Sequence, residues 1–331
     1  MSKIDGAARE YMGDKERFAD LFNFFMYAGE QVIKSDNLTE MDATEIALPV
    51  TNSGKSISVK KFRDMLSGAG IMTDGKAAYV ILGLENQDKI NYAMPIRNML
   101  YDALQYAAQA AAIKNKHEED KDLPSGAEYL SRFSKTDSVT PVITLVLYLG
   151  PGKWTGKRSL HQLFNTKDKT IKKYAQDYKL NLIAPGEMDE EEFKKFHTEL
   201  GKLLFYIKYS DNKEYLKQKV EQNPEYRSVD EETVDFVNLV TNSKLTYKKR
   251  KDGKVDMCQA IEGIRNEGIE IGIEQGIEKG IEKGIEKGSI LTLFNLVEKG
   301  AITIEYAADQ SGMSVPDFEA KAKEYTKENN K

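Results

Sequence analysis

A continuous apolar run, Ala78-Tyr-Val-Ile-Leu-Gly-Leu84, is the feature that most restricts how this chain can fold. A strand with one wet face alternates apolar and polar residues, whereas a strand covered on both faces is apolar throughout. A second such run extends from Val139 to Leu149 and is closed by Gly150-Pro151-Gly152. We therefore expect a sheet that is covered on both faces, with these two runs as its buried strands.

Helices are predicted on either side of the first run. Apolar residues at three- and four-residue spacing predict a helix over Asp14–Ile33, and Pro95 is placed to open a second helix that reaches about Ile113. Gly68, Gly70 and Gly75 predict a loop. Less regular strands are predicted over 37–49, 58–66 and 181–184. The order of helix, strands, helix and strand indicates an α/β layer fold.

The pattern becomes helical after Gly186, with helices predicted over 188–209, 211–221 and 230–243. We therefore predict four parts: an α/β domain at 1–186, a helical extension at 187–250, a glycine-repeat helix or linker at 251–288, and a small helical module at 289–331.

Composition excludes several classes of protein. The 331 residues are 40% hydrophobic and 31% charged, which fits a globular chain rather than a disordered one. A single cysteine excludes an intrachain disulfide framework, and three histidines make a structural zinc site unfavourable. The longest apolar run, 142–150, is too short to span a bilayer, and the first thirty residues contain no signal-peptide core. We expect a cytoplasmic protein.

The buried strand ends in the polar residues Glu85, Asn86 and Gln87, and Asp64 precedes it on the neighbouring predicted strand. Side chains two apart on a strand share a face, so Glu85 and Gln87 point the same way. Burying such groups is costly without partners, and a hard divalent cation is one partner that carboxylate oxygens can bind. The alternative is that these residues are ordinary polar groups at the rim of a sheet.

The stretch from Phe62-Arg-Asp64 through Ala78-Tyr-Val-Ile-Leu-Gly-Leu-Glu85-Asn-Gln87 to Tyr92-Ala-Met-Pro95-Ile-Arg-Asn-Met-Leu-Tyr101 resembles the recombination-promoting nuclease family. These transposase-like proteins belong to the PD-(D/E)xK nuclease superfamily. The resemblance covers roughly 14–210, and the glycine repeat is also typical of such proteins. It implies a restriction-endonuclease-like αβββαβ core and a DNA endonuclease that depends on Mg²⁺ or Mn²⁺.

The same resemblance assigns roles to individual residues. Asp64 and Glu85 would be the metal-binding carboxylates, and Gln87 would stand where the wider superfamily has lysine. Gln87 can neither act as a base nor carry positive charge, so it could only orient water or a phosphate oxygen. Asp20 and Gln105 could add polar support, although a solvent-facing position is the plainer interpretation of both.

A local basic excess follows the second apolar run, although the net charge of the chain is −5. Residues 153–179 contain eight basic and two acidic residues, with Trp154, Tyr174 and Tyr178 interleaved. Basic and aromatic side chains together can follow a nucleic-acid backbone and stack on bases. The candidate contacts are Lys153, Lys157, Arg158, Lys169, Lys172 and Lys173. The alternative is a solvated loop and helix face.

The C-terminal third contains a repeat in which six glycines, from Gly268 to Gly288, are spaced four residues apart. A period of four excludes heptad coiled-coil packing, and each helical glycine costs about 1 kcal/mol relative to alanine. We expect a helix over 263–288 that pairs with a second copy or with the rest of the chain, or else a linker. The tail at 289–331 has helix–turn–helix spacing, but its mixed charge favours contacts with protein.

Two functions compete at this stage. The first is a metal-dependent DNA endonuclease that uses Asp64 and Glu85. The second is a catalytically inactive nucleic-acid-binding or regulatory oligomerisation protein, which the acidic net charge favours because strong DNA binders are usually basic. No membrane partner is expected.

Overall fold

The computed structural model describes residues 3–41, 64–73, 76–123, 126–248 and 250–329. The chain divides into two compact units, one that ends at Ile261 and one that begins at Glu262. The finer four-part division stays a prediction.

A five-stranded mixed sheet forms the centre of the first unit, and its strands lie in chain order. These strands are β1 (Leu38–Glu40), β2 (Met65–Thr73), β3 (Lys76–Gln87), β4 (Val142–Tyr148) and β5 (Asn181–Ile183). β1, β2 and β3 are antiparallel neighbours, whereas β3, β4 and β5 run parallel. The predicted α/β class is confirmed.

The two apolar runs are the neighbouring strands β3 and β4, in a register that pairs Leu84 with Leu145 and Glu85 with Val146. Leu82 and Leu84 on β3 are completely buried, as are Leu145 and Leu147 on β4. This burial explains why both runs lack the alternation of a half-exposed strand.

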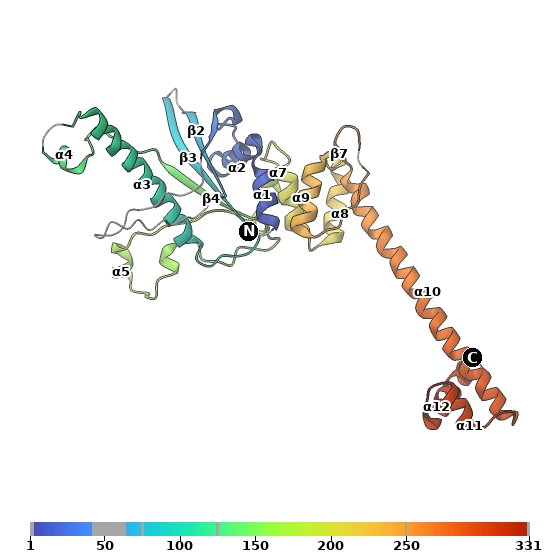
Figure 1. Cartoon of the computed structure of the whole chain (residues 1–331). Helices are drawn as coiled ribbons and strands as arrows, with labels where there is room; N and C mark the ends of the chain where they lie inside the picture. Colours follow the sequence, from blue (N-terminus) through green and yellow to red (C-terminus); the bar gives the residue numbers. More distant parts are fainter. Residues whose placement is uncertain (1–2, 42–63, 74–75, 124–125, 249, 330–331) are drawn as a thin grey trace. The chain divides into compact units, whose positions relative to one another are not determined.

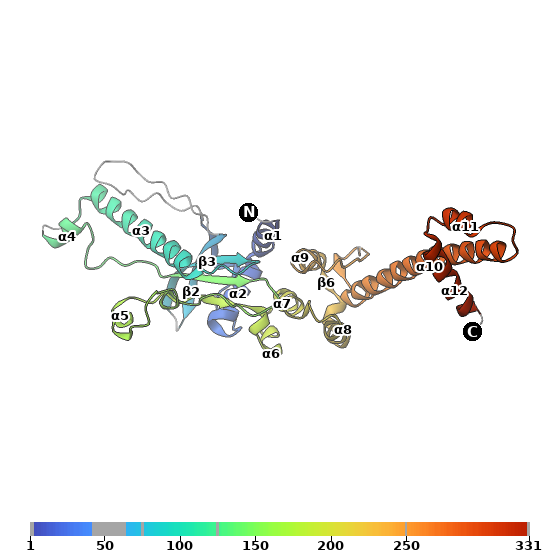
Figure 2. The ribbon, with the colours of Figure 1, turned by 90° about the horizontal axis from the view of Figure 1, so that it is seen from below.

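Helices pack on the sheet, with α3 (Met94–Asp120) against β4 and α1 (Lys3–Met12) against β3. α2 (Lys15–Tyr27) lies on the side of the sheet away from α3 (Figures 1 and 2). The remaining helices of this unit are α4 (Ala127–Ser131), α5 (Lys169–Tyr174), α6 (Glu190–Phe193), α7 (Leu200–Tyr209), α8 (Lys213–Gln222) and α9 (Glu231–Thr241). α7 packs against both α8 and α9, which lie beside it in Figures 1 and 2. A short hairpin pairs β6 (Val229–Asp230) with β7 (Lys254–Val255).

The helical extension is attached to the α/β part through α1. Tyr11 stacks on Phe236 of α9, with ring centroids 4.7 Å apart, and its hydroxyl lies 3.0 Å from Thr233 Oγ1. Tyr11 is buried, and this burial raises the pKa of its phenol above the ordinary value. Residues 187–261 therefore share a core with the first part of the chain.

The loop predicted from Gly68, Gly70 and Gly75 is wrong for the first two glycines, which lie inside β2. Gly68 pairs with Thr39 on one side and Ile81 on the other, so β2 is hydrogen-bonded along both edges. Two ladders outweigh the weak strand propensity of glycine. The strand predicted over 58–66 continues as β2 from Met65, and its residues 58–63 lie outside the described residues, as do 42–49 and Gly75.

The single helix predicted over 188–209 is also wrong, because the chain leaves the helix between α6 and α7. Asp20 of α2 accepts the backbone N–H groups of His197 and Thr198 at 2.8–3.1 Å. The end of α2 approaches the same segment so closely that a Cβ on Gly29 would lie 2.7 Å from the carbonyl oxygen of Lys195. Tertiary hydrogen bonds therefore replace helical ones here.

The glycine repeat lies within one helix, α10 (Met257–Glu298), which α11 (Ile304–Gln310) and α12 (Val315–Asn329) follow. A small core joins the end of α10 to these two helices through Ile290, Ala307 and Phe318. Among the residues that the structure describes, no helix combines the length and apolar character needed to cross a bilayer.

Candidate metal-binding active site

The ends of β2 and β3 bring the predicted carboxylates together. The register pairs Met65 with Leu84, so one further step places Asp64 opposite Glu85. Asp64 Oδ2 accepts a hydrogen bond from the backbone N–H of Asn86 at 2.8 Å, which extends the contact between the two strands beyond the last pair of the ladder. Alternation then points Glu85 and Gln87 to one face of the sheet and Asn86 to the other.

Glu85 is completely buried, and its partner is Arg97 on the first turn of α3. Arg97 Nη2 lies 2.9 Å from Glu85 Oε2, and Arg97 Nε donates to the Tyr101 hydroxyl at 2.8 Å. A buried carboxylate stays charged only with such a partner. The sequence analysis did not identify Arg97.

A pocket of about 440 Å³ opens beside these residues. Asp64, Gln87 and Arg97 line it, together with the connection from Asp88 to Tyr92 and with Asp5 of α1. Burial raises the pKa of the Asp64 carboxyl, and the Asn86 N–H and the Arg97 charge offset only part of that effect. A raised pKa marks a carboxylate that lacks full compensation, which is typical of functional sites.

Gln87 stands at the mouth of this site, half-buried at the end of β3. Its Nε2 donates to the backbone carbonyl of Asn86 at 2.8 Å. That bond fixes the amide and leaves the side-chain oxygen as the group that can accept a hydrogen bond from water.

The face of α3 that covers the sheet is polar, which the sequence analysis did not recognise. Asn98 and Gln105 are buried, and Asp102 accepts hydrogen bonds from Thr144 of β4 and, at 2.6 Å, from the Tyr178 hydroxyl. Neither amide atom of Asn98 has a hydrogen-bond partner among the described residues. A polar stripe at four- and three-residue spacing is the signal that could have revealed this face.

The solvent-facing interpretation of Asp20 and Gln105 is wrong, since both are buried. The hydrogen bonds of Asp20 run to Gln31, His197 and Thr198, where it holds the segment before α7. Gln105 lies two turns beyond Asn98 on the covered face of α3. Support of the active site by either residue stays a prediction.

The basic segment 153–179 is tied to the sheet next to this pocket. Trp154 is buried against Met94, Tyr148 and Ala184, and Ile90 of the pocket wall packs on the same cluster. The two ends of this segment meet where the N–H of Leu180 donates to the carbonyl oxygen of Arg158 at 2.8 Å. The hydrogen bond from the Tyr178 hydroxyl to Asp102 attaches the segment to α3. Trp154 and Tyr178 thus have structural roles, and Tyr174 is the exposed aromatic residue of the three.

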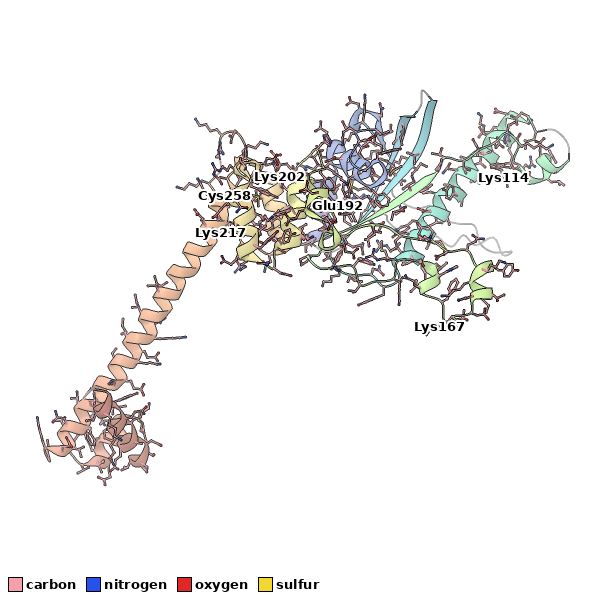
Figure 3. The ribbon with its side chains drawn as sticks, turned by 180° about the vertical axis from the view of Figure 1, so that it is seen from behind. Lys114, Lys167, Glu192, Lys202, Lys217 and Cys258 are labelled. Carbon is pink, nitrogen blue, oxygen red and sulfur yellow. The ribbon has the colours of Figure 1, made fainter. Side chains whose placement is uncertain are left out.

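The candidate nucleic-acid contacts form two groups on the segment 153–179. Lys153, Lys157 and Arg158 are exposed in the loop beside Trp154, where Arg158 pairs with Glu187. Lys169 and Lys173 are exposed and Lys172 is half-buried on α5, which follows Lys167, labelled in Figure 3. Tyr174 is 77% exposed and lies under the Lys173 ammonium at 5.9 Å. The structure therefore presents basic side chains and one exposed aromatic ring on this segment.

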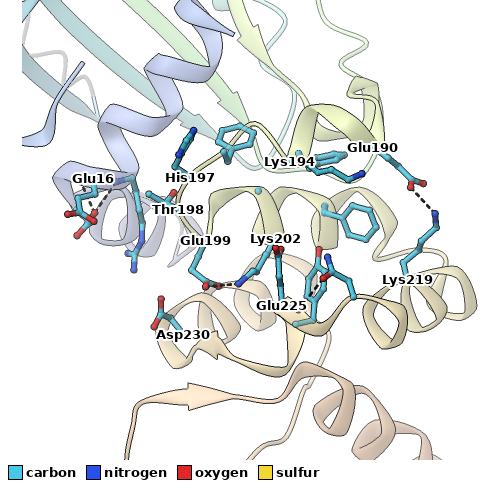
Figure 4. A pocket seen from close by; sticks show the side chains of 18 of the residues that line it. Glu16, Glu190, Lys194, His197, Thr198, Glu199, Lys202, Lys219, Glu225 and Asp230 are labelled. Atoms are coloured by element: carbon cyan, nitrogen blue, oxygen red, sulfur yellow. Dashed lines mark hydrogen bonds and ion pairs between the residues drawn. The ribbon is translucent and has the colours of Figure 1, made fainter. Parts of the chain in front are cut away.

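A larger pocket of about 1030 Å³ lies elsewhere in the first unit, between α2, α6, α7 and α8 (Figure 4). Its charged walls are paired with one another: Glu190 with Lys219 at 2.8 Å, and Glu199 with Lys202 at 2.9 Å. The hydrogen bonds from Lys219 and Tyr215 lower the pKa of Glu190 to about 2. Such mutual compensation is typical of a solvated groove, so the smaller pocket is the better candidate for chemistry.

The chemistry of the oxygen ligands at this site is of the kind that a hard divalent cation prefers. It offers the carboxylate oxygens of Asp64 and Glu85 at neighbouring strand ends, and Gln87 lines the same pocket as Asp64. No group of three or more His, Cys, Asp or Glu side chains suited to a metal occurs among the described residues. Mg²⁺ commonly needs only one or two carboxylates, because water and phosphate oxygens complete its shell.

Residues 60–233, more than half of the chain, match the family model described as "Putative transposase, YhgA-like". The chain belongs to this YhgA-like transposase family. The matched segment contains Asp64, Glu85 and Arg97, and all the candidate nucleic-acid contacts. Membership indicates a transposase-associated role in DNA processing and implies an interaction with DNA. The chain matches no curated protein and no solved structure.

Proposed function

We propose that this YhgA-like protein is a metal-dependent DNA endonuclease of the PD-(D/E)xK type. The observation that carries the proposal is the placement of Asp64 opposite the buried Glu85 at the ends of two neighbouring strands. The order α2, β1, β2, β3, α3, β4 supports it, because an αβββαβ core has that order of elements. Membership of a DNA-processing family agrees with a nucleic-acid substrate.

Each residue has a distinct task in this proposal. Asp64 and Glu85 hold Mg²⁺ or Mn²⁺, which when bound lowers the pKa of water and neutralises charge on the scissile phosphate. Gln87 accepts a hydrogen bond from the attacking water or donates one to a phosphate oxygen, but takes no proton. The lysines of residues 153–173 hold the DNA backbone beside the pocket.

The second candidate function, an inactive DNA-binding or regulatory protein, is favoured by one observation. Arg97 already neutralises Glu85, so the site could persist as an ion pair that holds no metal. The net charge of −5 supports the same alternative.

Nicking of supercoiled plasmid separates the two functions. We expect the purified full chain to nick DNA with Mg²⁺ or Mn²⁺ and to stop with EDTA. D64N and E85Q should lose activity, whereas D88N, in the wall of the same pocket, should keep it. DNA binding without cleavage under all metal conditions would select the inactive alternative.

A further inference from the structure

Arg97 combines two properties that a purely structural arginine does not need. Its guanidinium reaches a carboxylate that is completely buried, yet its own side chain is 32% exposed and lines the pocket. Tyr101, one turn later on α3, fixes the Nε edge at 2.8 Å and lies with its ring 5.5 Å from the guanidinium carbon. The Nη edge is thereby aimed at the site, with open space beside it.

Two cations cannot share Glu85 without cost. The carboxylate is shielded from water, so its charge requires a neighbouring cation, which Arg97 supplies. A divalent ion between Asp64 and Glu85 would face the same guanidinium at short range, where repulsion is only weakly screened. Metal and Arg97 therefore compete for Glu85.

We propose that Arg97 is an exchangeable cation. Its guanidinium pairs with Glu85 until a divalent metal replaces it there, and Arg97 then binds a phosphate of the DNA. This inference rests on the proposed function and adds a regulatory step to the same site. A planar guanidinium fork suits both partners, since carboxylates and phosphates accept the same paired hydrogen bonds. The exchange makes Arg97 a positioning residue for Glu85 and couples metal binding to DNA binding.

Calorimetric titration of the full chain with Mn²⁺ tests the exchange without measuring cleavage. R97M should raise the Mn²⁺ affinity by about tenfold or more, because it removes a competing charge from a poorly screened site. R97K, which keeps the charge, should stay near the original affinity. E85Q should abolish binding both alone and together with R97M.

DNA affinity should move in the opposite direction. With Ca²⁺ in place of the catalytic ion, R97M should bind duplex DNA more weakly and lower the slope of log affinity against log salt by about 0.9, one phosphate contact. R97K should keep most of that slope. An arginine with only a structural role would change neither the Mn²⁺ affinity nor the salt slope beyond what misfolding explains.

The unaltered protein supplies a readout that does not depend on the folding of a variant. The Nε–H resonance of Arg97, assigned by its loss in R97K, should shift saturably as Mg²⁺ is added. The exchange is overturned if folded R97M has unchanged or weaker Mn²⁺ affinity, or if the Arg97 resonance does not shift when Mg²⁺ binds. Either result leaves the proposed function intact. If the unaltered chain binds neither Mg²⁺ nor Mn²⁺, the proposed function fails as well.

Discussion

The guanidinium of Arg97 lies 2.9 Å from the carboxylate of Glu85, which is the polar end of an otherwise apolar strand. This pair connects the first turn of α3 to the last residues of β3, on the face where Asp64 meets the same strand. The site is therefore assembled from adjacent strand ends and one helix, all within the segment that matches the YhgA-like family.

Replacing Asp64 with Asn should abolish Mn²⁺ binding without destabilising the fold. The raised pKa of Asp64 means that its ionised form opposes folding. The stability that its protonated form contributes is complete below the unfolded pKa of about 3.9 and is lost as the pH rises through the higher folded pKa. An uncharged Asn can still accept the Asn86 N–H. The melting temperature of D64N at neutral pH should equal or exceed that of the unaltered chain, measured by circular dichroism beside the D88N control. A large loss of stability would show that Asp64 is a structural carboxylate.

Replacing Asp20 should reduce stability rather than metal binding. The carboxylate accepts hydrogen bonds from two backbone N–H groups and from the Thr198 hydroxyl in a buried position, so D20A should cost roughly 2–4 kcal/mol in urea unfolding. D20N should lie between, since one of its oxygens becomes a donor facing a donor. D36A, at an exposed aspartate, is the matched control. If D20A keeps full stability but loses Mn²⁺ affinity, Asp20 belongs to the active site.

The strands were predictable where both faces are buried, because such strands are apolar throughout. The apolar runs at β3 and β4 identified two central strands, and strand alternation placed Glu85 and Gln87 on one face. Arg97 was not predictable by the same means, because its partner is chosen by how α3 lies on the sheet. The break between α6 and α7 likewise depends on Asp20, which lies 177 residues before His197. Gly68 and Gly70 wrongly predicted a loop, because hydrogen bonds to the neighbouring strands β1 and β3 outweigh the local preference of glycine.

Reversing charge on α5 should weaken DNA binding. Lys169 and Lys173 are exposed and Lys172 is half-buried, so a K169E/K172E/K173E variant should lose affinity for duplex DNA and show a flatter salt dependence. Fluorescence anisotropy across a salt series measures both quantities. The control K34E/K195E/K213E makes the same charge change at exposed lysines on other elements. Equal losses in both variants would indicate a general effect of net charge, and no loss in either would assign α5 to solvent.

The end of α3 carries a pH-dependent clamp. His117 Nδ1 lies 2.6 Å from Asp122 and Nε2 lies 2.9 Å from Asp137, so both ring nitrogens face carboxylates and the imidazolium is favoured. The bonds to Asp122 and Asp137 raise the pKa of His117, while the Ser134 N–H and His117 lower that of Asp137.

The stability from His117 is complete below its unfolded pKa of about 6.5 and is lost as the pH rises through the raised folded value. The contribution of Asp137 is instead lost as the pH falls through its lowered pKa. Hydrogen exchange at Ser134 and Thr136 should accelerate above the His117 pKa beyond the intrinsic rate, and H117N should remove this step. A His117 imidazole that titrates at its ordinary pKa by NMR would contradict the clamp.

The glycine repeat should set the oligomeric state. Ile273, Ile277, Ile281 and Ile285 are 57–68% exposed on α10, an arrangement that favours association with a second helix. A Cβ added at Gly276, Gly280 or Gly284 would meet no described atom within 4 Å, so substitutions there fit within the chain itself.

If two copies pair along this stripe, G276L/G280L/G284L should block their close approach and shift the mass in light scattering from a dimer toward the 37.4 kDa monomer. G276A/G280A/G284A is the matched control, because it raises helix propensity by about 1 kcal/mol per site while adding little bulk, and it should keep the dimer. A monomer in all three proteins would end the dimer proposal, whereas a dimer that survives the leucine variant would place the contact outside the glycine stripe.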